Sequence, residues 1–125
     1  MAKAKSAPIQ WLSEAEDHDY PAAGSYLALL HPADRVAALL TRLRAEPIVQ
    51  FKAKDIFRAS RLSLLGVSNS HVERDRKKIK RGQALSPLLL VRDEADGRVV
   101  IADGYHRLCA VYAVDEDAVI PCKIT

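Results

Sequence analysis

The stretch Val99–Ala110, with the sequence VVIADGYHRLCA, changes from a strand pattern to a helix pattern within a few residues. Its apolar, mostly β-branched beginning is typical of a strand. Asp103 and Gly104 then mark a turn, and apolar residues at helical spacing follow from Leu108. The stretch therefore predicts a strand that ends at Ala102 and a helix that begins directly after the Asp-Gly turn.

Four residues at this turn suggest chemistry as well as structure. Asp103 is placed to be the N-cap of the helix, where its carboxylate would accept free backbone N–H groups. Gly104 lets the backbone turn tightly and lets another group approach closely. His106 and Arg107 fall in the first helical turn, where basic side chains add to the positive end of the helix dipole. This arrangement predicts a bound anion, and a simple cap followed by a solvated first turn is the alternative.

Composition bounds the class of protein. A chain of 125 residues, 49% apolar and 28% charged, fits one globular domain with a substantial core. No apolar run approaches the roughly 20 residues that span a membrane, and the first residues lack the apolar core of a signal peptide, so we expect a cytoplasmic protein without a membrane partner. Cys109 and Cys122 are then expected to be reduced and buried, and their spacing from the histidines predicts no metal site.

The first part of the chain is expected to be helical. We interpret residues 1–8 as a disordered lead-in and residues 9–47 as a helical extension built around a hairpin of helices at 21–30 and 32–45. Ser13 and Glu16 have the spacing of a capping box, which predicts a short helix there. A metal site or a base is one interpretation of the acidic residues around His18, and a solvated loop is the favoured one. These acidic residues are Glu14, Glu16, Asp17 and Asp19.

The second part, residues 48–125, mixes strands and helices. Alternating or continuous apolar patterns predict strands at 48–53, 87–91, 98–102 and 119–124. Residues 55–60 are predicted to form a short helix or a turn. Helices are predicted at 71–81 and 104–114, the first of these two starting at a capping box made by Ser70 and Glu73. The whole chain is therefore expected to be α+β, with strands, packed helices and an N-terminal helical hairpin.

The predicted helix 71–81 is strongly basic. His71, Arg74 and Lys78 fall at i, i+3 and i+7, on a face beside the apolar edge formed by Val72 and Ile79. Such a face suits the binding of phosphates across a cleft, although a charged helix is more often simply solvated. The basic residues of this helix are Arg74, Arg76, Lys77, Lys78, Lys80 and Arg81.

The order of these motifs resembles the ParB/sulfiredoxin superfamily over roughly residues 48–125. Gly104-Tyr105-His106-Arg107 is similar to the Gly-Cys-His-Arg of sulfiredoxins, and Ile120-Pro121-Cys122-Lys123 is similar to their Ile-Pro-Xaa-Lys ending. The longer Asp-Gly-Xaa-His-Arg pattern looks like that of free-serine kinases and ParB-like nucleases. The resemblance implies a small stand-alone member with a ParB/sulfiredoxin-like mixed sheet and packed helices.

The resemblance also implies a site for nucleotide phosphates at the start of the last helix. It maps onto Gly104, Tyr105, His106 and Arg107, with His71, Arg74 and Lys78 as helpers. Tyr105 stands where sulfiredoxins carry their catalytic cysteine, so sulfinic-acid reduction is not expected. The chain ends at Thr125 without a helix-turn-helix, so a chromosome-partition role is not expected either.

Three hypotheses follow. The first is an ATP- or CTP-dependent phosphotransferase or hydrolase that uses Mg²⁺, in which Asp103 holds the metal or activates an acceptor, His106 acts as acid or base, and Arg107 holds the phosphate. The second is a non-catalytic module that binds a nucleotide, or DNA through the basic helix 71–81. The third is an interaction protein whose site has decayed. The sequence leaves the nucleotide and the oligomeric state open.

Overall fold

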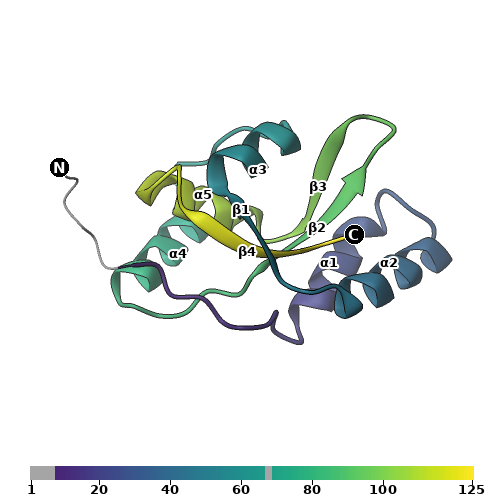
Figure 1. Ribbon diagram of the computed structural model, residues 1–125, viewed down its shortest axis with the longest axis horizontal. Helices are drawn as coiled ribbons and strands as arrows, with labels where there is room; N and C mark the ends of the chain where they lie inside the picture. Colours follow the sequence, from purple (N-terminus) through teal and green to yellow (C-terminus); the bar gives the residue numbers. More distant parts are fainter. Residues whose placement is uncertain (1–7, 67–68) are drawn as a thin grey trace.

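The computed structural model describes residues 8–66 and 69–125 and shows an α+β protein. Over these ranges the chain forms five helices and one four-stranded sheet (Figure 1). The predicted lead-in at 1–8 falls almost wholly on residues 1–7, which lie outside the described part of the chain.

The elements follow the predicted order of helices and strands. The helices are α1 (Asp19–Leu27), α2 (Ala33–Ala45), α3 (Ala53–Ser60), α4 (Ser70–Lys80) and α5 (Tyr105–Val114). The strands are β1 (Val49–Lys52), β2 (Leu88–Asp93), β3 (Arg98–Asp103) and β4 (Val119–Ile124).

The sheet is mixed, as predicted, with the strand order β1-β4-β2-β3. β1 pairs antiparallel with β4, and β2 pairs antiparallel with β3 through a hairpin. β4 lies parallel to β2, and α5 is part of the connection between β3 and β4. The end of β3 and the start of α5 therefore stand beside β2, where the Asp-Gly turn joins them.

Both faces of the sheet are covered, which explains why Leu88–Val91 is continuously apolar. Leu88 and Leu90 belong to a core shared with α3, α4 and α5, whereas Leu89 and Val91 belong to a second core shared with α1 and α2. A strand that is buried on both faces has no solvent-facing positions for polar residues. Figure 1 shows the α1–α2 hairpin at the end of the molecule opposite α4 and α5.

The N-terminal hairpin is fastened to the sheet by polar contacts as well. The side chain of Lys123, on β4, is only 4% exposed, and its Nζ lies 2.7 Å from Glu14 Oε1. The same Nζ donates a hydrogen bond of 2.9 Å to the carbonyl of Arg44 at the end of α2. Two backbone hydrogen bonds join residues 10–12 to Leu85 in a parallel β-bridge. The segment before α1 therefore runs alongside the residues that lead into β2.

Four of the predicted helix starts are wrong, and one of them is that of α3, which begins at Ala53 rather than at residue 55. Residues 13–16 form no helix, because the Glu16 amide donates to Asp19 Oδ2 and Ser86 Oγ instead of a helical partner. The helix predicted at 21–30 begins earlier, at Asp19, and ends at Leu27. The cap of α4 is Asn69 rather than Ser70: the Asn69 side chain accepts bonds from the amides of His71 and Val72.

Two further properties bear on the class of protein. Among the helices in the described ranges, none is long and apolar enough to cross a membrane. Cys109 and Cys122 are free and buried, as predicted, and burial raises the pKa of both thiols, that of Cys122 to about 12. Cys109 is therefore a core residue of α5 rather than a nucleophile.

Candidate functional site

The Asp-Gly turn places the start of α5 tightly against β2. Gly104 has φ +108°, a left-handed conformation that favours glycine. A Cβ on this residue would lie 2.8 Å from Leu88 Cγ and 3.0 Å from Arg107 Nη2. The glycine is therefore required both by the backbone and by the close approach of its neighbours.

Asp103 does not cap α5, which corrects the sequence prediction. The N-cap position belongs to Gly104, and Asp103 pairs instead with Arg107, whose Nη2 lies 2.9 Å from Asp103 Oδ2. The same Nη2 donates to the carbonyl of Pro87 at 3.3 Å, and Arg107 Nε is buried without a hydrogen-bond partner in the described chain. Arg107 thus faces inward and braces the turn, and the predicted phosphate contact by this residue stays a prediction.

Asp19 lies beside the Asp103–Arg107 ion pair, whereas the sequence analysis favours a solvated loop at this position. Asp19 is only 3% exposed and accepts hydrogen bonds from Ser86 Oγ and the Glu16 amide. It lies near Asp103: burial raises the pKa of Asp103, Arg107 opposes this rise, and the Asp19 carboxyl adds to it. The neighbouring residues Glu16, Asp17 and His18 are exposed, as a solvated loop predicts.

A second cluster lies on the other side of the turn, where α4 packs against α5. The rings of His71, on α4, and His106, on α5, have centroids 4.9 Å apart. Arg74 Nη2 lies 2.8 Å from His71 Nδ1, so one guanidinium and two imidazoles meet in one place. These are three of the residues that the sequence predicted to share a phosphate site.

The start of α5 adds backbone donors to this cluster. No side chain in the described ranges caps α5, and its first intrahelical bond runs from the Leu108 amide to Gly104. The amides of Tyr105, His106 and Arg107 therefore have no acceptor within the helix. An uncapped helix start beside basic side chains is favourable for an anion, because the free N–H groups and the helix dipole both attract negative charge.

The surroundings of His106 disfavour the protonated form of its ring. Burial lowers the pKa of His106, and His71 and Arg74 lower it further, while Asp75 opposes them. A group of like charges with a depressed histidine pKa is expected where a negative ligand is to be bound.

The two remaining predicted residues lie at the edges of the cluster. The Tyr105 ring centroid is 5.6 Å from that of His106, and the Tyr105 hydroxyl donates to the carbonyl of Ser63. Lys78 extends along α4 and pairs with Asp75 at 4.0 Å. The predicted catalytic roles of Asp103 and His106 stay predictions.

The carboxylates do not fit the Mg²⁺ that the sequence analysis expected with a nucleotide. Asp103 Oδ2 is engaged by Arg107, and Asp19 Oδ2 by Ser86 and Glu16. Glu16, His18 and Asp19 offer ligand atoms within 4.8 Å of one another, but the hydrogen bonds to Asp19 compete with a metal there. Mg²⁺ keeps near-octahedral oxygen ligands and several waters, which a carboxylate committed to arginine does not provide.

Comparison of the chain with protein-family models, with curated proteins and with solved structures gives no match.

Proposed function

We propose that this protein binds a nucleotide through its phosphates, at the cluster formed by His71, Arg74 and His106 and the start of α5. We call this the basic cluster. The observation that supports the proposal best is the meeting of side chains from two helices, with the His71 and His106 rings 4.9 Å apart, beside uncapped amides. The resemblance of the Asp-Gly-Tyr-His-Arg turn to phosphate-binding turns points to the same ligand.

The chemistry of the cluster favours a phosphate over a carboxylate. Arg74 offers several N–H groups, and the three amides of the first turn of α5 have no acceptor within the helix. A terminal phosphate has three acceptor oxygens and more than one negative charge, so it satisfies several donors at once. In this proposal Arg107 positions the turn through Asp103, and the ligand contacts Arg74, the two histidines and the backbone.

DNA binding by α4 is the second candidate. Among the described ion pairs, α4 contributes only Lys78 with Asp75, so Arg76, Lys77, Lys80 and Arg81 have no ion-pair partner there. Such unpaired cations can neutralise DNA phosphates, and this contribution falls steeply with salt. A nucleotide site and a DNA surface are therefore distinguished by which basic residues matter and by the slope of affinity against salt.

The experiment is thermal unfolding of the purified chain with ATP, CTP, ADP and pyrophosphate, each with and without Mg²⁺. A ligand at one hundred times its Kd stabilises by about 2.7 kcal/mol, which raises the midpoint by several degrees in a chain of this size. We expect such a rise with at least one nucleotide and a smaller one with pyrophosphate. The absence of any rise would overturn the proposal.

Two variants with the same loss of charge locate the site. Arg74→Gln removes a cation from the basic cluster, and Lys80→Gln removes one from an exposed position farther along α4. A charged hydrogen bond contributes about 1.5–3 kcal/mol, so Arg74→Gln is expected to weaken binding by tenfold or more. Lys80→Gln should bind as the wild type does. Equal effects of the two variants would favour the DNA-type surface.

A further inference from the structure

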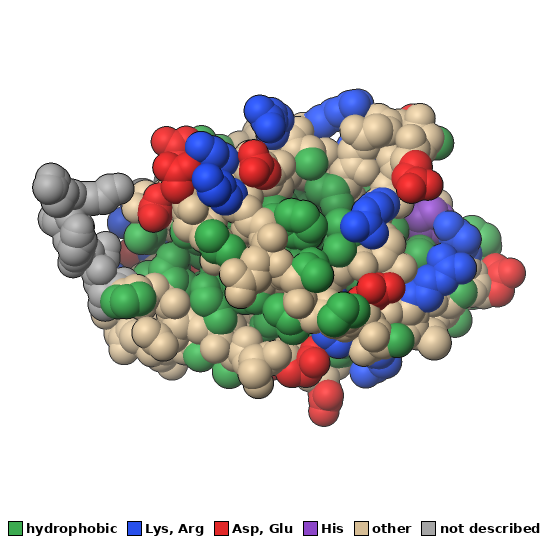
Figure 2. All heavy atoms as spheres, in the orientation of Figure 1, with side chains coloured by type: hydrophobic (Ala, Val, Ile, Leu, Met, Phe, Trp, Pro, Cys, Tyr) green, Lys and Arg blue, Asp and Glu red, His purple; other side chains and the backbone are tan. Residues whose placement is uncertain are grey.

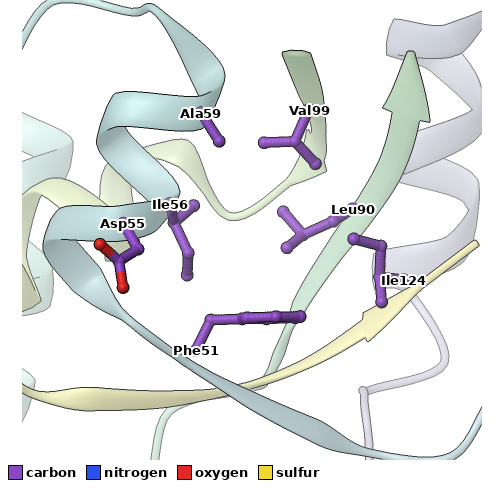
Figure 3. Close-up of a pocket in the computed structure, with 7 residues that line it drawn as sticks. All are labelled: Phe51, Asp55, Ile56, Ala59, Leu90, Val99 and Ile124. Atoms are coloured by element: carbon purple, nitrogen blue, oxygen red, sulfur yellow. The ribbon is translucent and has the colours of Figure 1, made fainter. Parts of the chain in front are cut away.

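A separate apolar pocket lies between α3 and the sheet, and its lining includes no residue of the basic cluster. Its walls come from all four strands and α3, and they include Phe51, Ile56, Leu90, Val99 and Ile124 (Figure 3). Phe51 is 37% exposed and forms part of the rim. In the view of Figure 2, hydrophobic side chains gather in the middle of the molecule's visible face, with charged side chains around them.

The pocket is large enough for a small organic group. Its volume is about 190 Å³, and the accessible surface of its lining is apolar. An apolar protein cavity of about 150 Å³ stays dry and takes up benzene. This pocket therefore has room for one aromatic ring or a branched chain of similar size, and filling it would remove apolar surface from water.

One unpaired cation stands at the side of the pocket. Arg92 is opposite Val99 in the β2–β3 register and follows Leu90 by two residues, so its side chain is on the same face of the sheet as both. A wider hollow of about 350 Å³ shares Phe51 and Val99 with the pocket and is lined by Arg92. The Arg92 amide donates to the carbonyl of Thr125 at 2.7 Å, which fixes this strand position.

The acidic side chains nearby are mostly committed to other arginines. Asp93 pairs with Arg98 at 3.1 Å, and Arg98 lowers the pKa of the Asp93 carboxyl. Asp55, at the other side of the pocket, pairs with Arg58 at 3.5 Å. Glu94 also lines the wider hollow, but it lies on the turn beyond the last residue of β2. In the described chain, Arg92 has no ion-pair partner.

We propose that this pocket binds a small monocarboxylate that carries one aromatic or branched apolar group. The apolar group fills the space between α3 and the sheet, and the carboxylate meets Arg92, whose planar guanidinium suits two parallel hydrogen bonds. An apolar pocket with a small number of placed polar or charged groups is the usual construction of a small-molecule site. This site is independent of the nucleotide site proposed above.

The test is a titration of the isotope-labelled protein with 3-phenylpropanoate, followed through the amide resonances of Val99 and Ile124. We expect saturable shifts at these residues, and at least tenfold weaker binding of 3-phenylpropylamine, which has the same ring and the opposite charge. Saturation without shifts at Val99 and Ile124 would overturn the proposal, as would the absence of saturable binding. Equal binding of the amine would also overturn it, because Arg92 would then not select the ligand.

Three variants complete the test. Arg92→Gln should weaken binding of 3-phenylpropanoate by tenfold or more, whereas Arg42→Gln, which removes the same charge from an exposed position on α2, should leave it unchanged. Ala59→Leu adds bulk from α3 at an exposed residue that lines the pocket, and it should block the ring without disturbing the core. Wild-type affinity in either Arg92→Gln or a folded Ala59→Leu would contradict the assignment.

Discussion

The imidazole rings of His71 and His106 lie with their centroids 4.9 Å apart and their planes tilted by 41°. They come from different helices, and Arg74 stands beside His71 at 2.8 Å. The Arg74 guanidinium and the two imidazoles are therefore gathered near the start of α5, where no side chain of the described residues caps the first amides. The predictions below test this arrangement, the turn that creates it and the elements that support it.

The depressed pKa of His106 makes stability depend on pH. Its pKa in the folded protein lies below the unfolded value of 6.5, so the unfolded chain binds more protons between the two values. Stability is expected to be highest above pH 6.5 and to fall as the pH decreases toward the folded pKa of His106. Urea unfolding of wild type and His106→Gln from pH 7 to pH 5 measures this, and the variant should show the shallower fall. Parallel curves would contradict the prediction.

Gly104 should tolerate no side chain. In Gly104→Ala, the left-handed backbone costs about 1–2 kcal/mol, and the contact of Cβ with Leu88 adds a similar cost. Gly82→Ala is the matched control, because Gly82 also has a positive φ of 72° but no atom within 4 Å of an added Cβ. Chemical unfolding should show that Gly104→Ala lowers the free energy of unfolding by the sum of the backbone cost and the contact cost. Gly82→Ala should lower it by the backbone cost alone. Equal losses would mean that the approach to Leu88 is not tight.

The Asp103–Arg107 pair should matter more than the Asp93–Arg98 pair. The side chains of Asp103 and Arg107 are each 17% exposed, and Arg107 Nε already lacks a partner. Asp103→Ala is therefore expected to destabilise the protein by about 2–3 kcal/mol, because it leaves a largely buried cation unpaired. Asp93→Ala breaks a more exposed pair and should cost less than about 1 kcal/mol. Thermal unfolding of both variants measures these losses of stability. A smaller loss in Asp103→Ala than in Asp93→Ala would contradict the bracing role of Arg107.

The start of α4 gives a direct check on its cap. Asn69→Ala removes the oxygen that accepts from the amides of His71 and Val72, and it should cost about 1 kcal/mol. Ser70→Ala lies inside the helix and should cost little. If Ser70→Ala is the more harmful change, the capping box predicted from Ser70 and Glu73 is the correct description instead.

The sequence predicted the α+β class and the order of helices and strands, because these depend on local patterns. The mixed sheet was predicted only through the resemblance, because strand pairing joins segments that are far apart in the chain. Leu88–Val91 is continuously apolar, and the structure buries it on both faces. The meeting of His71, Arg74 and His106 could be anticipated from helical spacing and a resemblance, because the helix face beside Val72 and Ile79 is necessarily close to the core.

Contacts between distant segments could not be predicted. Asp19 follows three exposed residues, and hydrogen bonds from Ser86 and the Glu16 amide compensate for its burial. The sequence around Lys123 is that of an ordinary strand end and does not indicate that its side chain is buried. Contacts with Glu14 and with the carbonyl of Arg44 compensate for this burial. The sequence predicts that Asp103 caps α5. In the structure, Asp103 pairs instead with Arg107, four residues later, and the left-handed Gly104 takes the N-cap position.

The most direct test of the basic cluster is the titration of His106 by NMR, with and without saturating pyrophosphate. The account predicts that bound pyrophosphate raises the pKa of His106, since negative charge beside the ring favours its protonated form. At any one pH, the ring resonances of His31, which lies near the β2–β3 hairpin, should have the same chemical shifts in both samples. A His106 titration curve that pyrophosphate leaves unchanged would contradict the central claim, because no anion would then be bound at the start of α5.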